Sequence, residues 1–259
     1  MKFPIFQVDA FTDHIFGGNP AAVCPLDDWL DEEIMQQIAI ENNLSETAFF
    51  VNNNEVFELR WFTPEYEVDL CGHATLATAH VLFEHLGFDK PEIHFQTKSG
   101  LLKVRREDGR LMMDFPTDNM PQVEPPAVLF QALGVRSDLV FFTDDYMVVL
   151  GSEEEVQKLD PDFRILSELN ARGVIVTAPG NDVDFVSRFF APGAGIDEDP
   201  VTGSAHTKLT PYWSKRLGKN ILQARQISKR VGNLTCRNKG ERTEILGNAV
   251  TFMIGEITI

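Results

Sequence analysis

The sequence predicts a mixed α/β (α+β) protein made of two similar halves. Each half is expected to be a curled, mostly antiparallel sheet or open barrel around one central helix. The first observation is an internal repeat: Gly72-His73-Ala74 matches Gly203-Ser204-Ala205 at an offset of 131 (203 − 72), and Leu86-Gly87 matches Leu217-Gly218 at the same offset (217 − 86). The segments between these pairs therefore have equal length in both copies.

The second observation extends the repeat upstream. The stretch RWFTP at 60–64 matches RFFAP at 188–192 at an offset of 128 (188 − 60), so three residues are inserted in the second copy. A repeat of half the chain indicates two homologous half-molecules. A solenoid would repeat about every 20–50 residues.

The third observation is the character of the repeated helix. Residues 74–83, ATLATAHVLF, are apolar nearly all round, and such a helix must be enclosed by other elements. Many short strand patterns surround it in the sequence. A curved sheet wrapped around this helix satisfies both patterns.

The first half is expected to open with a strand at 4–11, followed by the segment 16–26, which turns out of it through Gly17-Gly18-Asn19-Pro20. Acidic residues precede apolar Ile34, Met35, Ile38 and Ile40, which predicts a helix over 31–43. Strands are expected at 45–51 and at 56–62, where apolar and charged residues alternate. The central helix over 73–87 ends at Gly87, and 100–115 is a hairpin around Asp108-Gly109.

The second half repeats this mixture of elements. Helices are expected near 127–134, 152–159 and from 203 onward, and strands at 139–143, 146–151, 173–179, 183–190 and in a closing run. Pro211 falls inside the last helix and predicts a kink or a late start there. The Pro-rich segment 119–128 is the candidate linker. We therefore expect one domain over 1–115, with 249–259 as a candidate addition to it, and a second over 116–248.

Composition narrows the classes of partner. The 259 residues carry 23 Lys and Arg against 39 Asp and Glu, a net charge of −16, which argues against nucleic acid and anionic membrane surfaces. Three cysteines form no disulfide framework and favour a reducing compartment. We find no secretory signal and no apolar run near the roughly 20 residues that span a bilayer. A cytoplasmic protein is expected.

The repeated helix starts are candidate anion sites. A helix N-terminus offers unpaired N–H groups and the positive end of the helix dipole, and Gly72 and Gly203 allow a ligand close to the backbone. Alternatively, the glycines only permit tight packing and Ser204 is a helix cap. The presence of the motif in both halves favours a ligand. If the halves face each other, both starts meet in one cleft suited to a small carboxylate.

Three ionisable residues near these starts are candidates for proton transfer. His73 can exchange a proton near pH 7, and Glu46 lies in an apolar stretch, where the pKa of a carboxyl group rises. Asp199 could orient His73 or hold a substrate amine. The alternatives are an exposed strand position or a turn acid for Glu46, a backbone-bonded helix-start residue for His73 and a cap for Asp199.

Other chemistries find less support. Cys71 could be a base because a helix N-terminus lowers the pKa of a thiol, or it could be a small buried residue. Its counterpart Thr202 is no base at neutral pH, which removes a symmetric two-thiol mechanism. No metal-ligand spacing and no nucleotide-binding loop is present, so no metal and no cofactor is implied.

Five ordered motifs carry a resemblance that spans essentially the whole chain. They are DAFTDHIFGGNPAAV, NLSETAFF, RWFTPEYEVDLCGHATLATAH, DEDPVTGSAHTKLTPYW and ARQISKRVGNL. Together they resemble the phenazine-biosynthesis PhzF-like isomerases, which are related in fold to diaminopimelate epimerase. The resemblance implies two similar domains with the active site between them, and a homodimer.

The resemblance also implies roles for individual residues. In the phenazine isomerase, a Glu in the SET motif moves a proton between carbons of a cyclic diene acid. Matched motif by motif, the catalytic residues are Glu46, His73 and Asp199. The substrate-binding residues are Asn19, Gly72, Gly203 and Ser204, with Cys71 and Thr202 as further candidates.

Differences from the epimerases sharpen the expectation. Cys71 matches their first catalytic cysteine, but Thr202 replaces the second, and Ala191-Pro192 replaces their substrate-reading Glu-Arg pair. We therefore expect a cofactor-independent isomerase that shifts a proton on a small carboxylate-bearing metabolite, cyclic or derived from an amino acid. A one-base epimerase using Cys71 and a non-catalytic binding protein are the alternatives.

Overall fold

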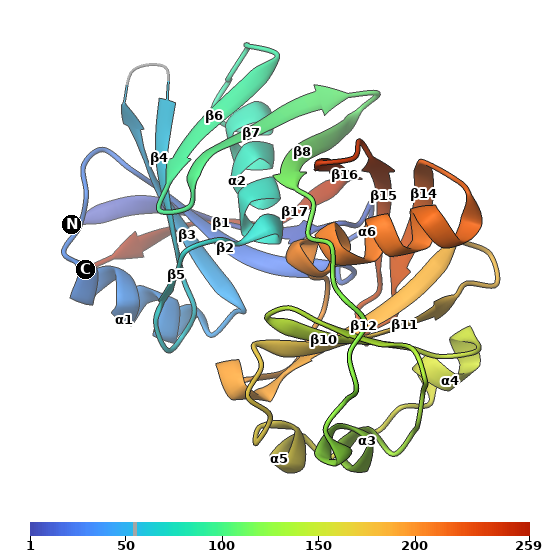
Figure 1. Cartoon of the computed structure of the whole chain (residues 1–259). Helices are drawn as coiled ribbons and strands as arrows, with labels where there is room; N and C mark the ends of the chain where they lie inside the picture. The colour runs from blue at the N-terminus through green and yellow to red at the C-terminus, as the bar shows by residue number, and fades with distance from the viewer. Residues whose placement is uncertain (54–55) are drawn as a thin grey trace. The chain divides into compact units, whose positions relative to one another are not determined.

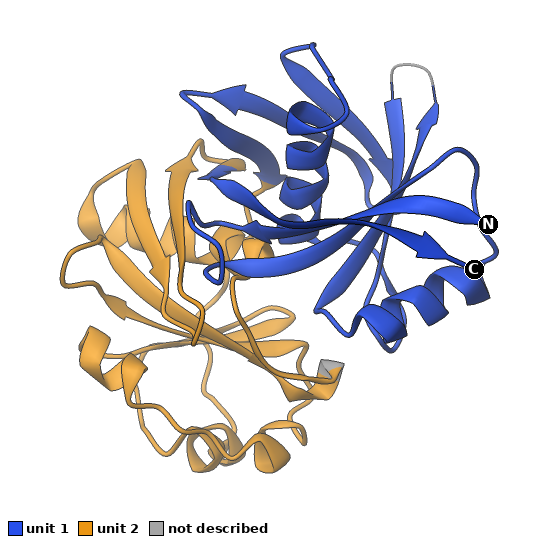
Figure 2. Cartoon of the chain, turned by 180° about the vertical axis from the view of Figure 1, so that it is seen from behind, with its two compact units in different colours: residues 1–115, 244–259 blue, residues 116–243 orange. Residues whose placement is uncertain are grey.

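The chain folds into two compact units in the computed structural model, which describes residues 1–53 and 56–259. The first unit comprises residues 1–115 and 244–259, and the second comprises 116–243 (Figure 2). The chain thus returns to the first unit at Glu244, earlier than the expected residue 249. Among the described residues, no helix is both long and apolar enough to cross a bilayer.

The first unit is a mostly antiparallel sheet that curls around α2 (Figure 1). Its elements are β1 (Lys2–Ala10), β2 (Asn19–Leu26), α1 (Glu32–Asn42), β3 (Glu46–Asn53), β4 (Val56–Phe62), β5 (Glu67–Val68), α2 (Gly72–Glu84), β6 (Glu92–Thr97), β7 (Gly100–Glu107), β8 (Arg110–Pro116) and β17 (Ala249–Thr258). Helix α2 packs against β1, β2, β3 and β17. The residues Ala74–Ala79 and Val81–Phe83 are all buried, so the apolar helix is enclosed as predicted.

The second unit is built from α3 (Ala127–Leu133), β9 (Val140–Phe142), β10 (Asp145–Val149), α4 (Glu153–Gln157), α5 (Phe163–Leu166), β11 (Gly173–Pro179), β12 (Phe185–Ala191), the 3₁₀ turn η1 (Pro192–Ala194), β13 (Ile196–Asp199), α6 (Gly203–Leu217), β14 (Ile221–Gln226) and β15 (Gly232–Asn238). It follows the order of the first unit from β9 to β15, with α3 added before β9 and two helices, α4 and α5, in the place of α1. Strand β16 (Arg242–Gly247) carries the chain back into the first unit. Helix α6 packs against β14 and β15.

Strand pairing repeats between the units step by step. The pair β1–β2 is antiparallel, as is β9–β10, whereas β2–β3 and β10–β11 are parallel. The antiparallel pairs β3–β4 and β4–β5 correspond to β11–β12 and β12–β13. Parallel β4–β6 and antiparallel β6–β7 correspond to β12–β14 and β14–β15. Such agreement supports the duplication that the sequence repeat predicts.

A buried ion pair is also repeated. Arg60 donates to both carboxylate oxygens of Glu67 at 2.7 and 2.6 Å, and Arg188 donates to both oxygens of Glu198 at 2.7 and 2.9 Å. The two glutamates differ by 131 positions (198 − 67) and the two arginines by 128 (188 − 60). Each pair ties two neighbouring strands together, β4 to β5 and β12 to β13.

The expectation of a late start at Pro211 is wrong, because α6 begins at Gly203 and continues to Leu217. Proline lacks the N–H that would bond to the carbonyl of Thr207, four residues earlier. That carbonyl accepts instead from the N–H of Asp118 at 3.3 Å. A backbone N–H from the segment before α3 therefore satisfies the Thr207 carbonyl, which Pro211 leaves without its helical donor.

Smaller differences lie at element ends. Asn19 and Pro20 already belong to β2, and α2 ends at Glu84, before Gly87. Ile40 is 44% exposed although its pattern placed it on the buried face. The hairpin is confirmed. Asp108 and Gly109 both have positive φ, 51° and 77°, as the two central residues of a type I′ turn require.

Candidate functional site

The first polar cluster lies at the start of α2. Glu46 is the first residue of β3 and pairs in register with Ala21 of β2, while His73 is the second residue of α2. The Glu46 Oε2 and His73 Nε2 atoms are 3.1 Å apart, with side-chain exposures of 14% and 4%. The structure thus brings together the two residues expected to exchange a proton.

The opposite edge of the His73 ring is also occupied. Its Nδ1 lies 3.1 Å from Asn19 Nδ2 and 3.5 Å from Cys71 Sγ. Asn19 is fully buried, and the backbone before it is tightly fitted: a Cβ on Gly18 would lie 2.0 Å from the Ala10 carbonyl oxygen. The imidazole of His73 therefore lies at the centre of one cluster. It contacts Glu46 through Nε2, and Asn19 and Cys71 through Nδ1.

Burial and charge set the protonation of this cluster. Burial raises the pKa of Cys71 to about 11, and the charge of Glu46 adds to the rise, so Cys71 is a thiol at neutral pH. Burial lowers the pKa of His73, but Cys71 and Glu46 raise it more, and the net shift is upward. The Glu46 carboxylate, 3.1 Å from Nε2, favours a proton on that ring nitrogen.

The same cluster contains three potential metal ligands. The ligand atoms of Glu46, Cys71 and His73 lie within 4.8 Å of one another. However, Cys71 approaches Nδ1 of the ring and Glu46 approaches Nε2. A single ion cannot use both with the ring in this orientation, so the geometry suits proton transfer along the Glu46–His73 contact better than metal binding.

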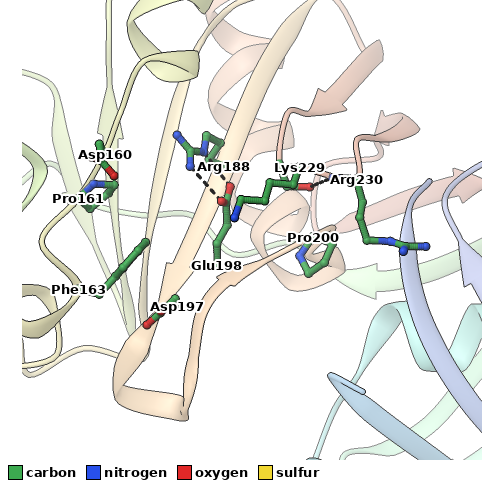
Figure 3. A pocket seen from close by; sticks show the side chains of 10 residues that line it. Asp160, Pro161, Phe163, Arg188, Asp197, Glu198, Pro200, Lys229 and Arg230 are labelled. Carbon is green, nitrogen blue, oxygen red and sulfur yellow. Dashed lines mark hydrogen bonds and ion pairs between the residues drawn. The ribbon is translucent and has the colours of Figure 1, made fainter. Parts of the chain in front are cut away.

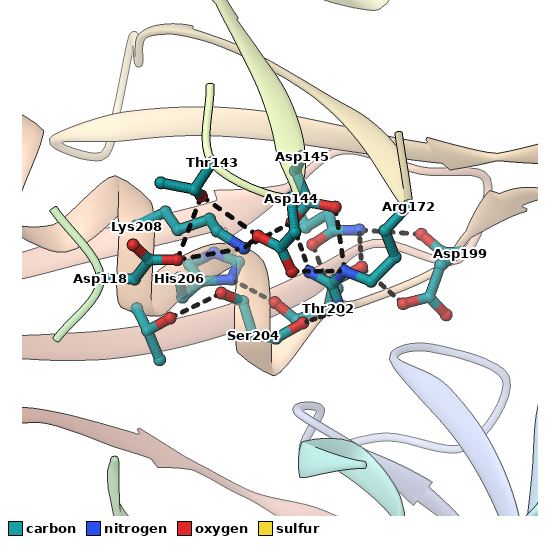
Figure 4. A network of polar contacts seen from close by, with 12 residues as sticks. Asp118, Thr143, Asp144, Asp145, Arg172, Asp199, Thr202, Ser204, His206 and Lys208 are labelled. Atoms are coloured by element: carbon teal, nitrogen blue, oxygen red, sulfur yellow. Dashed lines mark hydrogen bonds and ion pairs between the residues drawn. The ribbon is translucent and has the colours of Figure 1, made fainter. Parts of the chain in front are cut away.

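The second polar cluster lies at the start of α6 (Figure 4). The Thr202 hydroxyl donates to Asp199 Oδ2 at 2.5 Å, and the Thr202 N–H donates to Gln226 Oε1 at 2.9 Å. Gln226 Nε2 in turn donates to the Asp199 carbonyl at 2.8 Å. Asp199 and Thr202 are therefore held together directly before Gly203 and Ser204, the first residues of the helix.

The sequence reading missed Arg172, which lies at this helix start. Its Nη1 donates to Ser204 Oγ at 3.0 Å, its Nε donates to Asp145 Oδ1 at 2.9 Å, and its Nη2 donates to Asp145 Oδ2. The repeat could have located it. Thr47 pairs with Phe62 and Val174 pairs with Phe190, so the residue before Val174, next to Arg172, corresponds to Glu46.

Lys208 joins this network from the second turn of α6. Its Nζ lies 2.5 Å from Asp144 Oδ1, 2.8 Å from Asp145 Oδ2 and 3.4 Å from Asp118 Oδ2. Lys208 is 4% exposed and Asp145 is fully buried. Burial raises the pKa of Asp144, but Lys208 and Arg172 lower it more, to about 2. Burial lowers the pKa of Arg172, but the carboxylate of Asp145 raises it by more, so the net shift of the Arg172 pKa is upward.

A separate cavity of about 450 Å³ opens in the second unit (Figure 3). It is lined by Asp160, Pro161, Phe163, Arg188, Asp197, Glu198, Pro200, Ser228, Lys229 and Arg230. None of the predicted site residues is among these. Arg188 is already engaged by Glu198 and by the carbonyls of Val156 and Leu159, so it holds the fold together.

Comparison with known proteins identifies relatives over the whole chain. Residues 8–255 match the family model of the phenazine biosynthesis-like proteins. An uncharacterized isomerase of Pseudomonas aeruginosa is 54% identical over 257 residues, covering 99% of both chains. A crystal structure of a PhzF-family phenazine biosynthesis protein from Enterococcus faecalis is 48% identical, with a TM-score of 0.97 and complete coverage of both chains.

A more distant likeness concerns the fold alone. A probable proline racemase from Agrobacterium radiobacter is 11% identical, with a TM-score of 0.66 over 99% of this chain and 93% of that one. These structures confirm the predicted fold class of two epimerase-like halves.

Proposed function

The chain belongs to the phenazine biosynthesis-like family and is an isomerase, and from this premise we propose that it shifts a proton on a small carboxylate-bearing metabolite without a cofactor. Glu46 is the acid and base of this reaction. One observation carries the proposal: Glu46 Oε2 lies 3.1 Å from His73 Nε2 in a nearly water-free setting. Such a pair can accept a proton from a bound substrate and return it to another carbon.

The remaining contacts of the cluster support this role. A general base must keep its geometry while the substrate is bound. Here Asn19 and Cys71 hold the Nδ1 edge of His73, and Glu46 faces the Nε2 edge. A proton on His73 Nε2 stabilises the Glu46 carboxylate once Glu46 has given its proton away.

We assign substrate binding to the start of α6. Gly203 and Ser204 open a helix of 15 residues whose first N–H groups suit a carboxylate. The contact of Asp199 with Thr202 supports a role for Asp199 in binding a polar group next to that carboxylate. Gly72, at the start of α2, has the matching role in the first unit. The homodimer that the resemblance implies and the cytoplasmic location remain predictions.

Proton exchange in D₂O tests the proposal directly. Wild-type protein is incubated with a panel of small cyclic and amino-substituted carboxylic acids, and deuterium incorporation at carbon is followed by NMR. Glu46→Gln should reduce exchange by about 10²–10⁴-fold, the usual contribution of general acid–base catalysis, while the fold is retained.

The matched control is Glu58→Gln, because Glu58 is a partly buried carboxylate of the same unit bonded to Trp29 and Asn53. It should exchange substrate hydrogen at the wild-type rate. Wild-type exchange by Glu46→Gln would show that another group moves the proton.

A further inference from the structure

Arg172, which contacts the start of α6 through Ser204, takes no part in the proton transfer proposed for Glu46. We propose that Arg172 is a substrate-binding residue, whose guanidinium binds the substrate carboxylate together with the Ser204 hydroxyl. The inference rests on the proposed function only in that the substrate carries a carboxylate. It is argued from the position of Arg172 in the repeat and from its contacts.

The repeat relates Arg172 in the second unit to the proposed catalytic pair in the first. Ser204 corresponds to His73 at an offset of 131 (204 − 73), and Gly173 corresponds to Glu46 by strand register. In the first unit the start of β3 delivers Glu46 to His73. In the second unit Arg172 directly precedes β11, and its Nη1 donates to Ser204 Oγ at 3.0 Å. The acid of the first unit stands at the first residue of its strand, and the cation of the second unit stands one residue before the matching position, Gly173.

The contacts of the guanidinium leave part of it available to a ligand. Asp145 accepts from the Nε and Nη2 edge, and Ser204 Oγ accepts from Nη1. The Arg172 side chain is 41% exposed, whereas that of Asp145 is fully buried. Because Arg172 donates to the Ser204 oxygen, the hydrogen of that hydroxyl points elsewhere and can itself donate to an anion.

The surroundings hold Arg172 rigidly in this position. Asp145 is fixed from its other side by Lys208 at 2.8 Å, so the acceptor that orients the guanidinium is itself held in place. A carboxylate therefore meets a preorganised donor pair, which reduces the entropy lost on binding. Asp144 and Asp199 lie near the same guanidinium and raise its pKa. Their negative charge favours a carboxylate that carries a neighbouring ammonium or amino group over a bare anion.

Binding measurements on the full chain test this inference without any turnover. The probes are 2-aminobenzoate, benzoate and the neutral analogue benzamide, titrated by calorimetry or ligand-observed NMR. Wild type should bind 2-aminobenzoate more tightly than benzamide. Arg172→Gln should weaken 2-aminobenzoate binding by about tenfold or more, which corresponds to about 1.4 kcal/mol, and leave benzamide unchanged.

Two further variants make the result decisive. Arg216→Gln removes the same charge from the far end of α6, where Arg216 contacts Tyr212, and it should bind like wild type. Arg172→Lys keeps the charge opposite Asp145 but loses the planar fork, so it should fold even if Arg172→Gln does not, and should still bind 2-aminobenzoate more weakly than wild type.

Three results would overturn the inference: wild-type affinity in Arg172→Gln, wild-type affinity in Arg172→Lys, or a wild-type protein that binds neither carboxylate up to its solubility limit. The proposed function fails by a different observation, since it depends on proton exchange by Glu46 and not on affinity at Arg172.

Discussion

The starts of α2 and α6 are the same structural position built twice, and they carry different chemistry. In the first unit, β3 and α2 bring a carboxylate within 3.1 Å of an imidazole. In the second, the segment before β11 brings a guanidinium within 3.0 Å of a hydroxyl. An acid beside an imidazole can move a proton, whereas an arginine beside a serine can hold an anion and moves none at neutral pH.

The neighbouring strand explains how each position supports its side chain. Glu46 pairs in register with Ala21, and Gly173 pairs with Asp145. Ala21 carries no charge, and the ionisable group 3.1 Å from Glu46 Oε2 is His73. Asp145 is an anion that fixes a cation. Backbone register thus sets where the groups lie, and single side chains on the next strand decide which chemistry follows.

The largest effect on stability is expected from Asp145. Asp145→Asn leaves Arg172 and the buried Lys208 without their shared anion, and removal of one partner of a buried pair costs about 3–5 kcal/mol. Glu46→Gln should cost less than about 1 kcal/mol, because it keeps the size and polarity of the side chain. Urea denaturation followed by circular dichroism measures both, with exposed Asp138→Asn as the control. Equal losses would break the contrast between the two positions.

The two repeated ion pairs, Arg60–Glu67 and Arg188–Glu198, should contribute similarly to the free energy of unfolding, in contrast to the two helix starts. Glu67→Gln and Glu198→Gln each remove a bidentate acceptor from a partly buried arginine, and each should cost about 1.5–3 kcal/mol. The same denaturation experiment measures the two values. If one substitution proves neutral, the pairs are not equivalent supports of the two sheets.

Acid should weaken the second unit through Asp144. Its pKa in the folded chain is about 2, below the ordinary value of 3.8, so the folded state holds the proton less well than the unfolded state. The stability that Asp144 adds is present above about pH 4 and is lost as the pH falls toward 2. Melting temperatures of wild type and Asp144→Asn between about pH 5 and pH 2.5 should converge as the pH falls. A constant difference would refute the assignment.

The smallest effect is expected from Cys71. Its pKa of about 11 leaves a thiol at neutral pH, so Cys71→Ser should slow proton exchange by less than about tenfold, through its contact with His73. The one-base epimerase predicts complete loss instead. Exchange rates measured in parallel with Glu46→Gln separate the two mechanisms.

The sequence revealed most of the scaffold because periodicity and repetition are local signals. The apolar run at 74–83 predicted an enclosed helix, and the 131-residue offset predicted that α6 starts at Gly203. Pro211 misled the prediction, since the group that compensates it, the N–H of Asp118, is distant in sequence.

Site residues carried by local motifs could likewise be predicted, whereas a residue that depends on contacts distant in sequence could not. The cluster of Glu46 with His73 could be expected from motif resemblance. Arg172 could not be recognised by its own short motif, because its function depends on Asp145 and Ser204, which are 27 and 32 residues away. Strand register sets Arg172 beside Asp145, and the start of α6 brings Ser204 to the same guanidinium.

One paired measurement tests the two proposals together, which assign proton transfer to Glu46 and carboxylate binding to Arg172. Exchange rate at saturating substrate and dissociation constant are measured for Glu46→Gln and Arg172→Gln on the same exchanging acid. The account predicts that Glu46→Gln keeps the affinity and loses the exchange, while Arg172→Gln loses the affinity and keeps most of the exchange at saturation. Undiminished exchange by Glu46→Gln would contradict it.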